Sequence, residues 1–179
     1  MRALGPGSVS SLLKAILDVV RWALFISAGA ITVALFVVML LSFRPDLLNA
    51  PILTDQLDLH GAPLGPFLIA ALVGADLYVG GATLIVEGLR RIFQTLIAGD
   101  PFHPDNVQRL QLIAGTLAGL ELGRYVFVPA LNLISHDEIH RHAVRGVSLT
   151  TWFSVLVIVV LAEVFREGAR LRREAELTI

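Results

Sequence analysis

The feature that most constrains the fold of this chain is the stretch from Trp22 to Phe43, which contains no charged residue. Arg21 and Arg44 bracket it. A helix of about 20 apolar residues crosses the roughly 30 Å hydrocarbon core of a bilayer, so the stretch predicts a transmembrane helix. A secretory signal peptide would have a shorter apolar region and a small-residue cleavage site, which the sequence around Phe43 does not offer. We therefore expect this segment to stay in the mature protein as its first span.

Three further apolar segments follow the first one. The 179-residue chain has a mean hydropathy of +0.75 and 16% charged residues, whereas ordinary globular domains carry about a quarter. Inside a bilayer every backbone amide must be paired within the protein, which favours helices. The sequence thus predicts a single all-α domain, residues 1–179, built as an antiparallel bundle of four transmembrane helices with spans at about 22–43, 66–86, 110–134 and 147–165. In the alternative, the charged third segment does not cross, which leaves three spans.

The basic residues are distributed unevenly between the two sides of such a bundle. Cytoplasmic loops of membrane proteins are enriched in lysine and arginine, so the richer side is predicted to be cytoplasmic. Ten basic residues lie on one side, in the N-terminal segment, in the connection between the second and third spans, and in the C-terminal segment. They are Arg2, Lys14, Arg21, Arg90, Arg91, Arg109, Arg166, Arg170, Arg172 and Arg173. The other two connections hold Arg44, Arg141 and Arg145. Both termini are therefore expected in the cytoplasm.

The connection between the second and third spans is predicted to form a cytoplasmic helical hairpin. Residues 87–96 keep helical spacing and place Leu89, Ile92, Phe93 and Leu96 on one face. The run Gly99-Asp100-Pro101-Phe102 then interrupts the helix. Pro104 suits the first turn of the next helix, with His103 as its cap and Asp105 near its positive end.

The C-terminal segment is predicted to continue the fourth helix into water as a charged tail. Opposite charges recur three or four residues apart along it, in Glu163 with Arg166, Glu167 with Arg170, and Arg170 with Glu174. One interpretation is a solvated helix end that also anchors the topology. The other is a docking surface for a partner, shared with the hairpin, whose candidate residues are Arg90, Arg91, Arg166, Glu167 and Arg170.

In these two stretches the chain resembles a family of bacterial membrane proteins, domain of unknown function 2975. The resemblance rests on residues 89–93, on Gly99-Asp100-Pro101-Phe102-His103-Pro104-Asp105-Asn106 with Arg109-Leu110, and on residues 161–171. The resemblance implies a small four-helix protein of the bacterial cytoplasmic membrane, with no assigned catalytic residues. Because family members are often encoded beside a small helix-turn-helix DNA-binding protein, it also implies the membrane component of a regulatory pair. His103 departs from the family's threonine-like cap, but several polar residues can cap a helix.

Three charged residues are predicted near the bilayer centre: Asp76, Glu121 and Arg124. Each unpaired charge there costs about 2.5–3.5 kcal/mol on insertion scales, so the three are expected to pair as one cluster. Glu121 and Arg124 lie three residues apart on one helix face, and Asp76 lies at a similar depth on the preceding span. The cluster is the best candidate for a site within the membrane. Registration of the helices, an ion or proton path, and a switch or ligand pocket remain open as its role.

Gly115, Gly119 and Gly123 repeat every four residues on the third span, on the side roughly opposite Glu121 and Arg124. Small residues at this spacing allow membrane helices to approach closely. We expect this face to be filled by the first or the fourth helix, or else by a second copy of the chain in a homodimer.

The connection between the third and fourth spans holds His136, His140 and His142, which we regard as weak candidates for binding a metal ion. Histidines four residues apart on a helix can share zinc or copper, but no strict metal-binding motif is present, so no metal is predicted. His60 could add a ligand only if the two outer connections meet. There is no cysteine, which excludes disulfides and thiol chemistry within this sequence.

The family resemblance, together with the basic hairpin and the charged tail, implies a non-enzymatic regulatory or sensory membrane protein that works with a small cytoplasmic partner. The resemblance implies a DNA-binding regulator as that partner; the bilayer and a second copy are the other expected partners, with no cofactor and no direct contact with nucleic acid. The alternative is a small transporter or channel that uses Asp76, Glu121 and Arg124. An enzyme is disfavoured, because no nucleophile with a base, phosphate-binding loop or dinucleotide fingerprint is present.

Overall fold

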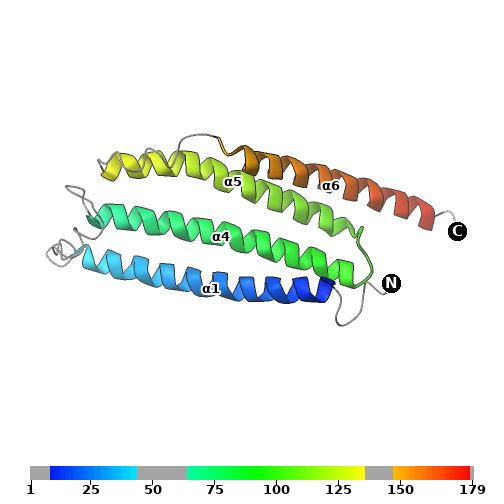
Figure 1. The fold of residues 1–179 in the computed structure, drawn as a ribbon, viewed down its shortest axis with the longest axis horizontal. Coiled ribbons are helices and arrows are strands. Elements are labelled where there is room, and N and C mark those ends of the chain that lie inside the picture. The colour runs from blue at the N-terminus through cyan, green and yellow to red at the C-terminus, as the bar shows by residue number, and fades with distance from the viewer. Residues whose placement is uncertain (1–8, 44–63, 136–146, 178–179) are drawn as a thin grey trace. The chain divides into compact units, whose positions relative to one another are not determined.

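The computed structural model describes residues 9–43, 64–135 and 147–177. These ranges contain four α-helices and no strand: α1 (Val9–Leu41), α4 (Leu64–Ile97), α5 (Pro104–Ser135) and α6 (Leu149–Glu176) (Figure 1). Each helix is long and apolar enough to cross a membrane, over Ala15–Leu41, Gly65–Ile97, Pro104–Leu133 and Leu149–Ala175. The described part of the chain is therefore all-helical and has the four helices expected of a multi-pass membrane protein.

The helices extend beyond the predicted spans at several ends. The segment at residues 87–96, predicted to continue as a helix beyond the second span, belongs to the last third of α4, which ends at Ile97. Gly99 adopts a φ of 83°, a backbone conformation that only glycine takes readily, and α5 begins at Pro104. At about 1.5 Å per residue, the 34 residues of α4 reach about 50 Å, well beyond the hydrocarbon core of a bilayer.

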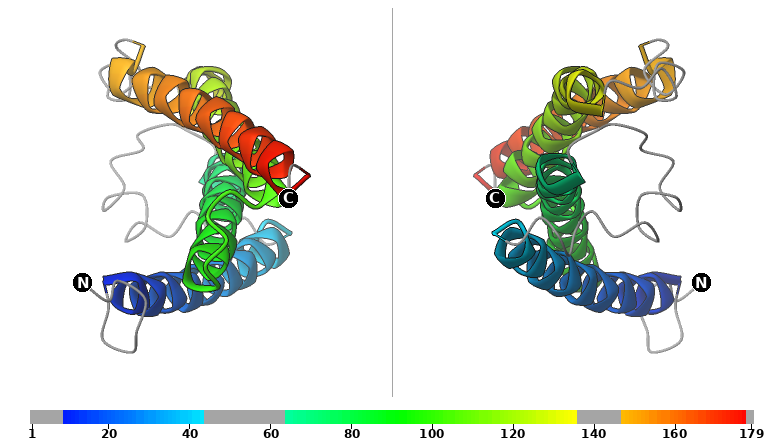
Figure 2. Two further views of the ribbon diagram at one scale, coloured as in Figure 1. Left: turned by 90° about the vertical axis from the view of Figure 1, so that its right-hand side faces the viewer. Right: turned by 90° about the vertical axis from the view of Figure 1, so that its left-hand side faces the viewer.

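The chain forms two compact units. The first unit comprises Met1–Phe25, Gly81–Gly119 and Ser148–Ile179. Its core is made of Ile92, Leu110, Ile113 and Ala162, from α4, α5 and α6. α4 and α5 approach closely here, because a Cβ on Gly88 would lie 2.9 Å from the Ile113 side chain. In both views of Figure 2 the red end of α6 lies beside the green beginning of α5.

The second unit comprises Ile26–Gly80 and Leu120–Val147. Within it α4 and α5 touch at Gly74, where a Cβ would collide with the ring of Phe127. Large apolar side chains such as Phe36, Val126 and Leu133 are exposed in this unit, with 62%, 74% and 80% of their surface accessible. Such exposure is unfavourable in water and ordinary for side chains that face lipid.

Candidate functional site

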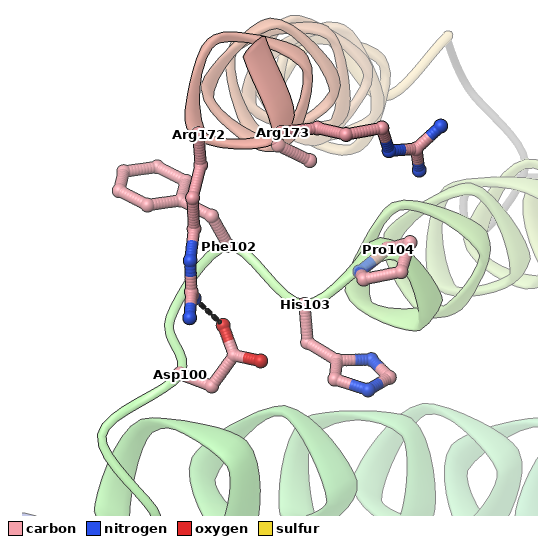
Figure 3. Close-up of a pocket in the computed structure, with 7 residues that line it drawn as sticks. Asp100, Phe102, His103, Pro104, Arg172 and Arg173 are labelled. Atoms are coloured by element: carbon pink, nitrogen blue, oxygen red, sulfur yellow. Dashed lines mark hydrogen bonds and ion pairs between the residues drawn. The ribbon is translucent and has the colours of Figure 1, made fainter. Parts of the chain in front are cut away.

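Two cavities in the first unit lie where the beginning of α5 meets the end of α6. The larger has a volume of about 510 Å³ and is called here the α5–α6 groove; it is lined by Pro104, Val107, Gln108, Glu163, Arg166, Glu167, Ala169, Arg170 and Arg173. The smaller, about 260 Å³, is called the loop cavity; it is lined by Asp100, Phe102, His103, Pro104, Ala169, Arg172 and Arg173 (Figure 3). Three of the predicted docking residues, Arg166, Glu167 and Arg170, thus line one surface.

A single buried side chain holds the connection between α4 and α5 in place. Asn106 is 0% exposed, and its Nδ2 donates to the Thr95 hydroxyl at 2.7 Å and to the Pro101 carbonyl at 3.1 Å. Its Oδ1 accepts from Arg109 Nη1 at 3.0 Å, and the same nitrogen donates to the Arg91 carbonyl at 3.2 Å. The Asn106 side chain thus donates two hydrogen bonds and accepts one. These bonds join the connection to α4 and to α5.

The first turn of α5 is capped from within the same connection. The Asp105 amide donates to His103 Nδ1 at 3.2 Å, so the His103 side chain is the cap that the sequence suggested. Pro104 has no amide hydrogen to satisfy. Asp105 lies at the positive end of the helix and pairs with Arg109 at 3.4 Å.

Two contacts fasten this connection to α6. The ring of Phe102 packs against Phe165, with centroids 5.7 Å apart, and lies over Gly168, where a Cβ would be 2.5 Å from Phe102 Cδ1. Asp100 forms an ion pair with Arg172 across the loop cavity (Figure 3). Only a residue without a side chain at position 168 leaves room for the ring.

The α6 wall of the groove carries alternating charges. Glu163 pairs with Arg166, Glu167 pairs with Arg170 at 2.7 Å, and Arg170 also reaches Glu174 at 3.5 Å. These are the three pairs that the sequence spacing suggested. All five side chains are more than half exposed, so each pair adds at most about 1 kcal/mol to stability.

The other predicted docking residues, Arg90 and Arg91, lie outside the α5–α6 groove on α4. Arg90 forms an ion pair with Asp18 of α1, and its side chain is 22% exposed. Arg91 pairs with Glu87 at 3.0 Å and is 57% exposed, while Glu87 also lies 3.5 Å from Arg21. The α4 arginines therefore join α4 to α1 and to its own preceding turn.

In the second unit, Arg124 Nη2 donates to Glu121 at 2.7 Å, one helical turn apart as the sequence suggested. The Glu121 side chain is 8% exposed, and the Arg124 guanidinium lies 5.2 Å from the centre of the Tyr125 ring. Asp76 is partly buried and makes no ion pair within the described residues. The structure therefore brings together two members of the predicted cluster.

Gly115, Gly119 and Gly123 are exposed on α5. A Cβ at any of the three would meet no atom within 4 Å, so no helix of the described residues packs into this face. Their predicted packing partner is therefore not among those helices, and a second copy of the chain stays a prediction.

His60, His136, His140 and His142 lie outside the described residues, and so do Arg141 and Arg145. Among residues 9–43, 64–135 and 147–177, no group of three or more potential ligands could hold a metal ion. The structure therefore does not test these histidines as candidate metal ligands.

Several residues that build the groove were not predicted from the sequence as site residues. No sequence pattern marks Val107, Gln108 or Ala169 as site residues. They line the groove only because α5 and α6 pack together. Asn106 belongs to the run that carries the family resemblance, but its burial follows only from the three-dimensional arrangement. Arg173 is one of several tail arginines, and nothing in the spacing distinguishes it from its neighbours.

A family model described as Protein of unknown function (DUF2975) matches residues 62–179 of the chain. The match extends over α4, α5 and α6, and so includes every residue that lines the two cavities. No curated protein and no solved structure matches the chain.

Proposed function

We propose that this chain, which belongs to the DUF2975 family, is a regulatory or sensory protein of the bacterial cytoplasmic membrane that holds a small cytoplasmic protein at its α5–α6 groove. The role is non-enzymatic: the membrane protein binds the partner and changes its availability. The expected partner is the small helix-turn-helix DNA-binding protein that the family resemblance implies. Membrane capture would remove such a regulator from its DNA.

The distribution of basic residues supports a cytoplasmic groove. Ten basic residues, among them Arg166, Arg170 and Arg173 of the groove, belong to the three segments assigned to the cytoplasmic side, and the other two connections hold three. In this topology α4 and α5 form a hairpin that extends into the cytoplasm, the end of α6 continues beside it as a helical tail, and the spans alternate in direction.

The observation that carries the proposal is the form of the groove itself. A cavity of about 510 Å³ between two helices is of the size that binds ligands or side chains of a partner. Its α6 wall carries both signs of charge, which gives specificity for one orientation of a charged partner. Asn106 and Phe102 fix the α5 wall, so the surface is preorganised.

Affinity purification of the full-length protein from its native membrane tests the proposal. We expect a small helix-turn-helix protein, identified by mass spectrometry, to co-purify with the chain and to be lost when residues 166–179 are removed. A second variant keeps the helix and replaces Arg166 and Arg170 by alanine, which removes two groove charges. Arg21→Ala is the matched control, because Arg21 is a partly exposed arginine of α1 outside the groove.

The proposal is contradicted if no helix-turn-helix protein co-purifies, or if it stays bound after the tail is removed. The competing role, a small transporter or channel, is favoured by the buried Glu121, which is paired with Arg124. Flux of protons or ions into proteoliposomes, abolished by Glu121→Gln, would support that role instead.

A further inference from the structure

Arg173 differs from the other arginines of the described residues in its charge environment. Every other arginine in the part of the chain that the structure describes forms an ion pair with a carboxylate there. Arg173 forms no ion pair with any side chain in that part of the chain. Its nearest arginine neighbour, Arg172, is held by Asp100. An exposed guanidinium without a carboxylate can form a bidentate, charge-assisted contact with an added anion at little desolvation cost.

Arg173 is the charged residue that lines both the α5–α6 groove and the loop cavity, together with the uncharged Pro104 and Ala169. Figure 3 shows its side chain extending past Pro104 and away from the Asp100–Arg172 ion pair. In the groove, Glu163 and Glu167 are each matched by an arginine of the groove. Among the described residues that line the groove, Arg173 is therefore the charge without an ion-pair partner, and these residues carry an excess of one positive charge.

The remaining surface of the groove is uncharged. Pro104, Val107 and Gln108 of α5 face the α6 wall, and Ala169 is the small α6 residue shared by both cavities. A volume of about 510 Å³ holds a few side chains rather than a domain. The occupant that fits is a short segment with a carboxylate beside small apolar side chains.

The position of Arg173 along α6 favours a protein segment over a lipid headgroup. It follows Phe165, the last residue of the predicted span, by eight residues, which is about 12 Å along a helix. The headgroup layer is only about 5–8 Å thick on each side of the hydrocarbon core. A helix aligned with the bilayer normal therefore carries Arg173 beyond the headgroups.

We infer that the α5–α6 groove binds an acidic segment of a partner protein, with a carboxylate of that segment on Arg173 and small apolar side chains over Val107 and Ala169. The inference rests on the proposed function and adds the chemistry of the bound segment. It assigns to Arg173 the role of the anionic contact. The ion pairs of Arg166 and Arg170 shape the groove on either side of that contact.

The test uses full-length protein in nanodiscs of neutral phosphatidylcholine and three fluorescent 14-residue helical peptides. The peptides share alanine and leucine positions and carry glutamate, glutamine or lysine at the remaining positions. Fluorescence anisotropy should give about tenfold tighter binding of the glutamate peptide than of the glutamine peptide, the effect of one charge-assisted contact. Arg173→Gln should abolish this difference, and Arg173→Glu should transfer the preference to the lysine peptide.

Arg21→Gln is the matched control, since Arg21 is a partly exposed arginine of α1 that lines neither cavity; it should keep the preference of the wild type. Arg173 is exposed, so its variants should fold with the thermal midpoint of the wild type. Two results overturn the inference: no preference in the wild type, or an unchanged preference in Arg173→Gln.

Purification from the native membrane separates this inference from the proposed function. If the helix-turn-helix protein co-purifies with Arg173→Gln as well as with the wild type, the groove has a partner but Arg173 is not its anionic contact. If no partner co-purifies with the wild type, the proposed function is wrong, whatever the peptides show.

Discussion

Replacing Asn106 by alanine should open the connection between α4 and α5. The substitution removes the two bonds donated to Thr95 and Pro101 and the one accepted from Arg109. Each intramolecular hydrogen bond contributes about 0.5–1.5 kcal/mol, so the free energy of local opening should fall by about 2–4 kcal/mol. At about 1.4 kcal/mol per factor of ten, local amide exchange should accelerate roughly 30- to 1000-fold.

Hydrogen–deuterium exchange followed by mass spectrometry measures this effect on the full-length protein in detergent micelles. The reporting amides are those of Ala98, Asp100 and Asn106, which donate to the backbone carbonyls of Gln94, Thr95 and His103 in and beside the connection. Thr95→Val removes one of the three bonds and should give the smaller acceleration expected of about 1 kcal/mol. Gln111→Ala, an exposed change further along α5, should leave these amides unaffected. Exchange in Asn106→Ala within threefold of the wild type would refute the reasoning.

Other substitutions test the packing of the helices. Gly168→Ala should lower the free energy of unfolding by about 1–3 kcal/mol in thermal unfolding, because its Cβ would meet the Phe102 ring. In the control Gly80→Ala a Cβ meets nothing within 4 Å, so the free energy of unfolding should not fall. Equal effects of the two substitutions would contradict the close packing at Gly168. A double-mutant cycle on Asp18 and Arg90 should give a coupling of about 0.5–1 kcal/mol, and zero coupling would show that the pair does not hold α1 to α4. Glu121→Gln should lower the thermal midpoint in nanodiscs, because it leaves Arg124 without its carboxylate; an unchanged midpoint would exclude a structural role.

The parts of the fold that follow from local sequence were predictable. The stretch from Trp22 to Phe43 lies mostly in α1 because hydrophobic length alone determines whether a helix can cross a bilayer. Gly99 and Pro104 mark the end of one helix and the beginning of the next, because each restricts the backbone at its own position. Arg124 reaches Glu121 because residues three apart share a helix face.

The parts that depend on contacts between distant segments were not predictable. Depth along the helices placed Asp76 level with Arg124, but depth does not determine how each helix is rotated, and no ion pair joins the two. The spacing of Gly115, Gly119 and Gly123 predicts close packing, whereas the close contacts among the described residues lie at glycines outside this repeat: Gly74, Gly88 and Gly168. Asp18 and Arg90 are 72 residues apart, and no pattern in the sequence links them.

The proposed groove acts on a cytoplasmic partner only if the end of α6 is inside the cell, and cysteine labelling measures this directly. The chain has no cysteine, so Arg173→Cys and Phe43→Cys each introduce a unique thiol. A membrane-impermeant maleimide should label Phe43→Cys in intact cells and Arg173→Cys only after permeabilisation. Labelling of Arg173→Cys in intact cells would place the groove outside and contradict the proposed function.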